Sequence, residues 1–303
     1  MAPETAPPIE SLFIVGSGIM GSGIAAVALA KGLRVHLYDV KDTYLDKGMA
    51  TVQKHLQKMA TRGGIPADQV DKAFSRLLPT LNLEDAGTCD FVIEAAPEVL
   101  ETKKDIFHRL DAIAPSHAIL GTNTSSLSIT LIASVVRDPG RVVGIHFFNP
   151  VPAMELVELI AGGRTRPETL ERARQLSTLL GKTVTASRDF PGFITTRSIG
   201  VLINEAVWML HEGVASREDI DTAHKLGFHH PMGPLELADL VGLDTALAIL
   251  ERLYTGFRDP KYRACPLLVN LVEAGRLGRK SGQGFYVYGA PGPSPPAAGG
   301  PTS

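Results

Sequence analysis

Three glycines near the amino terminus constrain the fold of this chain more than any other feature. The apolar segment LFIVG leads into a turn with the spacing GxGxxG over residues 16–21, and a helical pattern over residues 19–31 follows at once. In a strand–turn–helix unit, the first glycine permits the tight turn, the second lets the backbone approach a pyrophosphate, and the third lets helix and strand pack closely. The unsatisfied N–H groups at the helix start would bind that pyrophosphate. The predicted nucleotide contacts in this turn are Gly16, Ser17, Gly18, Ile19, Met20 and Gly21.

An acidic residue stands where such a unit reads the ribose of the nucleotide. The second strand, RVHLYD, ends at Asp39, which lies 18 residues after Gly21. Its carboxylate can accept hydrogen bonds from both ribose hydroxyls and would repel a 2′-phosphate. The segment therefore predicts NAD as the cofactor, with NADP as the alternative because Lys41 lies close by.

The alternation of strand and helix patterns predicts the fold class. The strand-like runs are LFIVG, RVHLYD, FVIEA, AILGT, VVGIHF, MELVELI and KTVTA, and helical patterns lie at 19–31, 43–62, 98–113 and 167–180. This alternation indicates an α/β, Rossmann-type, doubly wound and mostly parallel sheet. After residue 192 the strand patterns end, apart from FYVY near residue 288, and residues 193–274 read as helices.

These patterns divide the chain into four parts. We expect a flexible arm over residues 1–9, a nucleotide-binding domain over 10–188, an all-helical domain over 189–288 and a disordered tail over 289–303. The tail contains mainly Pro, Gly and Ala, which cannot build a core. Ser216 and Asp219 have the spacing of a capping box within the helical domain.

Composition excludes several classes of protein. Apolar residues make up 44% and charged residues 20%, as in compact soluble proteins, and the net charge of −2 gives no electrostatic footprint for nucleic acid or an anionic membrane. No apolar run reaches the ~18 residues of a membrane span, and the first residues do not resemble a signal peptide. Cys89 and Cys265 lack metal-ligand spacing. We expect a cytoplasmic protein that binds no membrane, nucleic acid or metal.

The segment VVGIHFFNPVPAMELVELI holds the candidate acid–base pair. Oxidation of a carbinol needs a base for the hydroxyl proton beside the nicotinamide. If the two strands pair about a centre near Pro152, His146 and Glu158 stand opposite each other, and the carboxylate fixes the imidazole tautomer. The alternatives are a histidine satisfied in the core, a glutamate turned to water, and a one-residue register slip that separates the pair.

Two further polar segments follow predicted strands. In GTNTSSLSI, the side chains of Asn123, Ser125 and Ser126 are placed to bind a substrate oxygen, or else to cap the loop and the next helix. In VIEAAPE, Glu98 opens the predicted helix, where a carboxylate suits the dipole without any further role. Lys103, one turn later, would reach a phosphate or be solvated.

The motifs, taken in order, resemble those of one family. GSGIMGSGIA, VIEAAPE, TNTSSLSIT, HFFNPVPAMELVE, PGFITTR, DIDTAHKLGFHHPMGPLELADLVGLD and GRKSGQGFYVY are similar to the (S)-3-hydroxyacyl-CoA and 3-hydroxybutyryl-CoA dehydrogenases over residues 11 to about 288. The resemblance implies a Rossmann-type domain, a helical domain that forms a homodimer, and a small acyl-CoA substrate. It also implies His146 as base, Glu158 as its orienting carboxylate, and Ser125 in contact with substrate and cofactor.

Other residue roles follow from the resemblance alone. Asp39, Glu98, Lys103 and, from the C-terminal end, Lys280 match positions that bind NAD. The helical hairpin after Asp39 matches the segment that covers coenzyme A, with the phosphate contacts near His55, Lys58 and Arg62. The family usually has Asn where this chain has Thr196, so the hydrogen bond to the substrate oxygen would come from Thr196, from Ser125 or from Asn149.

Two rival functions share these sequence features. One is a dehydrogenase of the same fold that acts on a free hydroxy acid, such as a sugar acid or carnitine. The other is a non-catalytic NAD-binding structural protein, against which the presence of both His146 and Glu158 argues.

Overall fold

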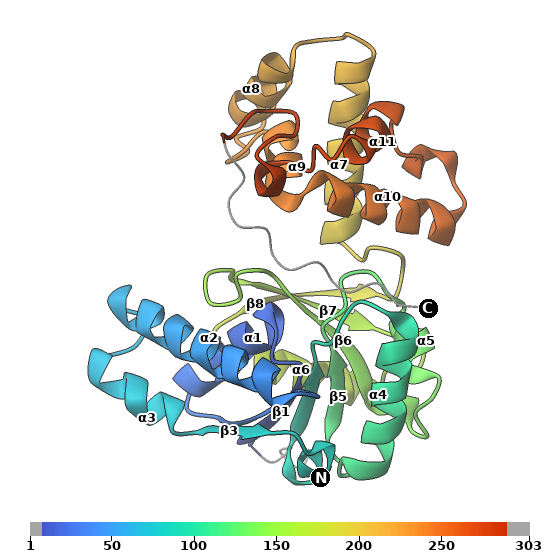
Figure 1. The fold of residues 1–303 in the computed structure, drawn as a ribbon. Coiled ribbons are helices and arrows are strands. Elements are labelled where there is room, and N and C mark those ends of the chain that lie inside the picture. Colours follow the sequence, from blue (N-terminus) through green and yellow to red (C-terminus); the bar gives the residue numbers. More distant parts are fainter. Residues whose placement is uncertain (1–7, 290–303) are drawn as a thin grey trace. The chain divides into compact units, whose positions relative to one another are not determined.

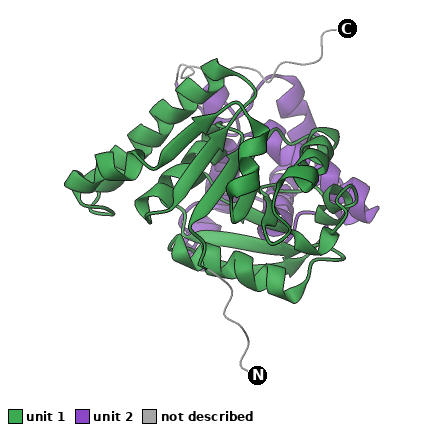
Figure 2. Ribbon diagram, turned by 90° about the horizontal axis from the view of Figure 1, so that it is seen from below, with its two compact units in different colours: residues 1–190 green, residues 191–303 purple. Residues whose placement is uncertain are grey.

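The computed structural model describes residues 8–289, and these fall into two compact units. The units comprise Met1–Phe190 and Pro191–Ser303, coloured green and purple in Figure 2. The boundary predicted after residue 188 lies two residues before this division. The predicted arm and tail lie outside the described residues, apart from residues 8, 9 and 289.

The first unit is built on one sheet of eight strands (Figure 1). The strands are β1 (Ser11–Val15), β2 (Arg34–Tyr38), β3 (Leu77–Thr80), β4 (Phe91–Glu94), β5 (Ile119–Thr122), β6 (Val142–Phe147), β7 (Leu156–Ala161) and β8 (Thr183–Arg188). Their order is β3-β2-β1-β4-β5-β6-β7-β8, and every neighbouring pair is parallel except β6 and β7. The predicted doubly wound, mostly parallel sheet is therefore confirmed, and the carboxyl ends of β1 to β6 share one edge of the sheet.

Helices cover both faces of this sheet. They are α1 (Ile19–Ala30), α2 (Asp42–Thr61), α3 (Val70–Phe74), α4 (Leu100–Ile113), α5 (Ile129–Ala133) and α6 (Pro167–Leu179), with short 3-10 turns η1 (Ala67–Gln69), η2 (Leu83–Thr88) and η3 (Pro139–Arg141). Residues of α1 and α6 share one apolar cluster with Ile145 and Leu159 of the sheet. On the opposite face, a Cβ added at Gly144 of β6 would lie 2.7 Å from Cδ1 of Ile129, so α5 packs closely against this strand.

Helix α2 packs closely on the glycine turn and on α1. A Cβ added at Gly48 of α2 would lie 2.6 Å from Cβ of Ser17, which is closer than carbon atoms can approach. The Ser22 hydroxyl of α1 donates to the carbonyl of Ser17 at 2.7 Å. A residue without a side chain at position 48 is therefore what allows this helix to lie against the turn.

Two local predictions about this unit were wrong or incomplete. Strand β3 was not predicted, because Leu77–Thr80 contains Pro79, and proline is tolerated in sheets at an edge such as this one. Helix α4 begins at Leu100 and not at Glu98, which lies before the helix. The carboxylate of Glu98 is therefore available to the loops rather than to the dipole of the helix.

The second unit is helical, as the sequence predicts. It contains α7 (Thr195–His211), α8 (Arg217–Gly227), α9 (Pro234–Val241), α10 (Leu243–Phe257) and α11 (Pro266–Glu273), with turns η4 (Pro260–Tyr262) and η5 (Arg279–Ser281). The hydroxyl of Ser216 caps α8 by accepting from the N–H of Asp219, as the capping box predicts. In the FYVY segment, Val287 forms one isolated bridge with Gln283. The segment is held by Asp239, whose carboxylate accepts from the N–H groups of Phe285 and Tyr286.

Two further observations concern the described chain as a whole. Both cysteines, Cys89 and Cys265, are free and buried. Within residues 8–289, no helix has both the length and the apolar character needed to cross a membrane.

Candidate active site

The antiparallel pairing of β6 and β7 brings an imidazole and a carboxylate together. His146 stands directly opposite Glu158 in the register, and Nδ1 of the histidine lies 2.9 Å from Oε2 of the glutamate. The two side chains are 9% and 0% exposed. The alternatives of a register slip and of a glutamate turned to water are therefore wrong. A ring held at Nδ1 by a carboxylate has a fixed tautomer and exchanges protons at Nε2.

The end of β6 is tied to the loop after β5. The side-chain oxygen of Asn123 accepts a hydrogen bond from the backbone N–H of Phe147 at 2.8 Å. The sequence left Asn123 between binding a substrate oxygen and capping the loop; in the structure its side-chain oxygen joins the loop to the end of β6. Asn149, two residues beyond the strand, is exposed.

The glycine turn has the geometry that its spacing predicts. Gly16 has a φ of 100°, and a Cβ there would lie 2.7 Å from the carbonyl oxygen of Ala95. A Cβ at Gly21 would lie 1.8 Å from the carbonyl oxygen of Gly16, so helix and turn touch at this residue. At Gly18 an added Cβ would meet no atom within 4 Å. The turn is thus tightly packed at the first and third glycines and open at the second, which fits a pyrophosphate at the start of α1.

Hydrogen bonds from the glycine turn orient Asp39. Its Oδ2 accepts from the N–H and the hydroxyl of Ser17 at 2.8 and 2.7 Å, and its Oδ1 accepts from the N–H of Val40 at 2.8 Å. The ammonium of Lys41 lies over the ring of Tyr44, 5.4 Å from its centre. The carboxylate is therefore held at the end of β2 beside the turn, where a ribose would lie.

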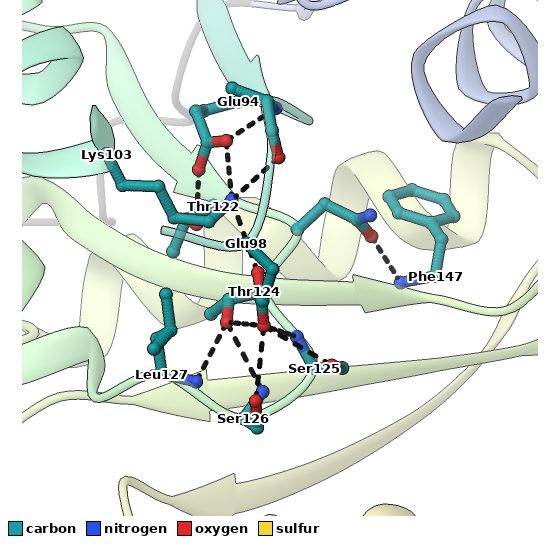
Figure 3. A network of polar contacts seen from close by, with 11 residues as sticks. Glu94, Glu98, Lys103, Thr122, Thr124, Ser125, Ser126, Leu127 and Phe147 are labelled. Atoms are coloured by element: carbon teal, nitrogen blue, oxygen red, sulfur yellow. Dashed lines mark hydrogen bonds and ion pairs between the residues drawn. The ribbon is translucent and has the colours of Figure 1, made fainter. Parts of the chain in front are cut away.

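Glu98 organises the loop that follows β5, as Figure 3 shows. Its Oε1 accepts from the hydroxyl of Thr124 at 2.6 Å and the N–H of Ser125 at 3.0 Å, with the hydroxyls of Ser125 and Ser126 at 3.3 Å. The capping of α5, which the sequence offered as an alternative role for Ser125 and Ser126, is carried out by Ser128. Both serines are half-buried at the carboxyl edge of the sheet.

Lys103 lies beneath this loop and not on the surface. Its side chain is 1% exposed, and Nζ lies 2.6 Å from Oε1 of Glu94 and 3.5 Å from Oε2 of Glu98. The alternative of a solvated lysine is therefore wrong. The sequence reasoning did not single out Glu94, although an acid at the end of the apolar strand FVIE is a signal that would have indicated a buried charge.

The predicted contacts for coenzyme A lie on α2. His55 is half-buried, whereas Lys58 and Arg62 are exposed, and the spacing of three and four residues places all three on one side of the helix. Partial burial, followed by the charges of Lys58 and Lys54, lowers the pKa of His55 below its ordinary value. At neutral pH this histidine is therefore uncharged.

Two predicted residues belong to the second unit. Thr196 is 7% exposed in the first turn of α7. The ammonium of Lys280, in η5, lies 2.5 and 2.6 Å from the two carboxylate oxygens of Asp244 in α10. The lysine that the resemblance assigns to the cofactor is thus positioned by an acid that the sequence reasoning did not identify.

Comparison with known proteins assigns both units. Residues 11–190 match the family model of the 3-hydroxyacyl-CoA dehydrogenase NAD binding domain, and residues 192–288 match that of the C-terminal domain. A 3-hydroxybutyryl-CoA dehydrogenase of Bradyrhizobium diazoefficiens is 48% identical over 287 residues, which cover 95% of this chain and 98% of that protein. A 3-hydroxyadipyl-CoA dehydrogenase of Escherichia coli is 40% identical, covering 93% of this chain and 60% of that protein.

A solved structure is similar over nearly the same length. The crystal structure of (S)-3-hydroxybutyryl-CoA dehydrogenase PaaH1 from Ralstonia eutropha has a TM-score of 0.90 and 44% identity, and the match covers 93% of this chain and 99% of that one.

Proposed function

This chain belongs to the 3-hydroxyacyl-CoA dehydrogenase family, and from this premise we propose how its residues carry out the NAD-dependent oxidation of an (S)-3-hydroxyacyl-CoA, or the reverse reduction. The observation that carries the proposal is the buried pair of His146 and Glu158 at the carboxyl end of β6. In an open α/β sheet, ligands bind outside this edge.

The proton is handled by His146. Its Nε2 takes the proton of the C3 hydroxyl as the C3 hydride leaves and the carbonyl forms. Glu158, which holds Nδ1, stabilises the imidazolium that results. In the reverse direction the imidazolium returns this proton to the oxygen, and the hydroxyl of Ser125 helps to bind that oxygen. Thr196 and Asn149 are the further candidates for this hydrogen bond.

The nucleotide is held by the turn and the two acids around it. Bound NAD supplies the hydride acceptor. The N–H groups at the start of α1 would bind the pyrophosphate, and the proposal is supported by Gly18, where an added Cβ would meet no atom within 4 Å. Asp39 accepts from the ribose hydroxyls, and Glu98, Lys103 and Lys280 complete the cofactor contacts that the resemblance implies.

The substrate is a small acyl thioester of coenzyme A. Two relatives carry the names 3-hydroxybutyryl-CoA and 3-hydroxyadipyl-CoA dehydrogenase, which supports a short chain with or without a second carboxylate. We assign the phosphates of coenzyme A to the side of α2 that carries His55, Lys58 and Arg62. These side chains supply two permanent cations and one titratable ring.

We also propose that the protein is a cytoplasmic homodimer assembled through the helical unit. In support, the apolar side chains of Val214, Leu226 and Phe228 in this unit are 65%, 74% and 67% exposed, so this unit has apolar surface that a partner subunit would cover. Size-exclusion chromatography with light scattering tests the dimer, and a monomeric mass at micromolar concentration contradicts it.

The reaction and its rivals are separated by one assay series. NADH oxidation is followed with acetoacetyl-CoA, free acetoacetate, longer 3-ketoacyl thioesters and a dicarboxylic one, and each is repeated with NADPH. We expect turnover with a thioester and NADH. Preference for a free acid would favour the sugar-acid or carnitine type of enzyme, and no oxidation with any thioester would favour a structural protein.

A further inference from the structure

We propose that Glu94 is a positioning residue for this reaction, since its buried carboxylate fixes Lys103 and thereby Glu98 and the loop of residues 123–126. The inference rests on the proposed role of that loop in binding NAD and substrate. Glu94 itself is fully buried, and Figure 3 shows it at the far end of the network from Ser125.

Glu94 joins three elements of the first unit. It ends β4 and is 0% exposed. Its Oε1 accepts from the N–H of Ala96 and from Nζ of Lys103, both at 2.6 Å. Its Oε2 accepts from the hydroxyl of Thr122, the last residue of β5, also at 2.6 Å. Both carboxylate oxygens are therefore used to connect β4, α4 and β5.

Lys103 connects Glu94 to Glu98, which lies in the loop between β4 and α4. An ammonium has three N–H donors. Here Nζ lies 2.6 Å from Oε1 of Glu94, 3.2 Å from the carbonyl oxygen of Ala96 and 3.5 Å from Oε2 of Glu98. The neighbouring Lys104 shows the ordinary behaviour of a helix lysine, with a 3.4 Å contact to the exposed Glu101.

Glu98 in turn defines the loop conformation. With Oε2 near Lys103, its Oε1 accepts from the hydroxyl of Thr124 and the N–H of Ser125. Asn123, at the start of the same loop, is bonded to the N–H of Phe147, which follows His146. A chain of contacts therefore runs from Glu94 through Lys103 and Glu98 to the loop of residues 123–126, and Asn123 joins this loop to the end of β6.

Stability alone does not account for this arrangement. A buried ion pair is often no more stabilising than apolar residues of the same shape, because both ions lose their hydration. The network also holds two carboxylates against one ammonium, so Glu94 and Glu98 compete for Lys103. A group that sets the position of Glu98 has a reason to be present at the carboxyl edge of the sheet, where the cofactor is proposed to bind.

The test separates positioning from stability with a mutant cycle. Glu94→Gln, Lys103→Met and the double variant are compared for NADH affinity by fluorescence, for kcat and KM with acetoacetyl-CoA, and for thermal unfolding. Ser125→Ala shows how much NADH affinity and turnover change when a residue of the loop itself is altered. We expect each single variant to weaken NADH binding at least tenfold and to lower the unfolding temperature. The double variant is expected to recover most of that unfolding temperature but not the NADH affinity.

Two control variants and one milder test variant make the outcome decisive. Lys104→Met, on the same helix, and Asp111→Asn, in a buried ion pair at the other end of that helix, are expected to keep wild-type NADH affinity. Thr122→Val removes one hydrogen bond to Glu94 and is expected to shift affinity in the same direction by a smaller factor, even if Glu94→Gln does not fold.

Two results overturn the proposal. One is a double variant that regains both stability and NADH affinity, because the pair is then purely structural. The other is wild-type NADH affinity in Glu94→Gln or in Thr122→Val while Ser125→Ala is impaired. If Ser125→Ala is itself indistinguishable from wild type in affinity and turnover, the proposed function of the loop is wrong, and the inference about Glu94 fails with it.

Discussion

Helix α4 carries a buried ion pair at each of its two ends, and the two pairs serve different surroundings. In the first turns, Lys103 meets Glu94 and Glu98 at the carboxyl edge of the sheet. In the last turn, Asp111 meets Arg141 at 2.9 Å and Arg137 at 2.6 Å, at the opposite edge. The pair at Lys103 is connected to loops that contain candidate site residues. At Asp111, Arg137 and Arg141 also donate to the carbonyl oxygens of Asp111 and Pro115, and so hold the turn after α4.

The charge balance at the two ends is also reversed. The ion pairs at the start of α4 join two carboxylates to one ammonium, whereas those at its end join one carboxylate to two guanidinium groups. Burial and ion pairing therefore do not distinguish a functional site from a structural tie. The position along the strands does, because loops that leave the carboxyl ends of parallel strands converge on a ligand and the opposite loops do not.

The strongest test of this comparison is the loss of the imidazole at the carboxyl edge. His146→Gln is expected to lower turnover ~10²–10⁴-fold, because the general base is removed while NADH binding stays intact. Stopped-flow or steady-state NADH oxidation measures the loss. Glu158→Gln is expected to lose activity as well, and wild-type turnover in that variant would contradict its orienting role.

A second test concerns cofactor choice at the same edge. Asp39→Asn is expected to weaken NAD binding roughly 10- to 100-fold, because hydrogen bonds to a charged group contribute about 1.5–3 kcal/mol each. The same substitution is expected to reduce the difference in binding affinity between NADH and NADPH. Ser17→Ala, which removes a hydroxyl that orients Asp39 at 2.7 Å, serves as a milder companion. Unchanged NADH affinity in both variants would contradict the ribose contact.

At the opposite edge the expected effect is on stability and not on turnover. Asp111→Asn leaves Arg141 without its buried partner and is expected to lower the free energy of unfolding by about 3 kcal/mol. Urea unfolding measures this, and kcat is expected to stay within twofold of wild type. A large loss of turnover with unchanged stability would remove the contrast between the two ends.

The pH dependence of stability sharpens the same point. Burial acts to raise the pKa of Asp111, but the hydrogen bonds from Arg137 and Arg141 outweigh it and hold the pKa below its usual range. Because the folded-state pKa lies below the unfolded value, this stabilisation is present above about pH 4 and is lost as the pH falls through the folded-state pKa. Asp111→Asn is expected to flatten the acid limb of the stability curve.

The smallest expected effect lies on α2. Because burial and the nearby lysines lower the pKa of His55, this ring is neutral at pH 7 and gains its charge only at lower pH. If it contacts a phosphate of coenzyme A, the KM for acetoacetyl-CoA is expected to fall roughly two- to fivefold as the pH is lowered from about 8 through the pKa of this ring, as for an exposed ion pair. His55→Gln removes that trend, and a pH-independent KM in wild type would contradict the contact.

The sequence predicted most of the first unit because its signals are local. The glycine spacing and the alternation of apolar runs identified the turn, the sheet and seven of its strands, and the symmetric spacing about Pro152 placed His146 opposite Glu158. Strand β3 escaped prediction because Pro79 weakens a strand pattern, and its place was decided by pairing with β2.

The polar network around Lys103 lay beyond sequence reasoning for a different reason. Its members come from β4, α4, β5 and two loops, so no single window of sequence contains them. A lysine in an amphipathic helix normally points to water, and only the tertiary structure shows that Glu94 lies beneath it. The prediction that Glu98 opens a helix failed because its carboxylate finds better donors in the loop after β5 than at the helix start.

The contact between Gly48 and Ser17 has a consequence for redesign. Any side chain at position 48 would push apart the helix and the turn, since its first carbon already collides with Ser17. In the proposed function, the turn that would bind NAD also supports the helix that leads to His55 and Arg62. A library that varies the turn to change cofactor selectivity therefore has to include position 48.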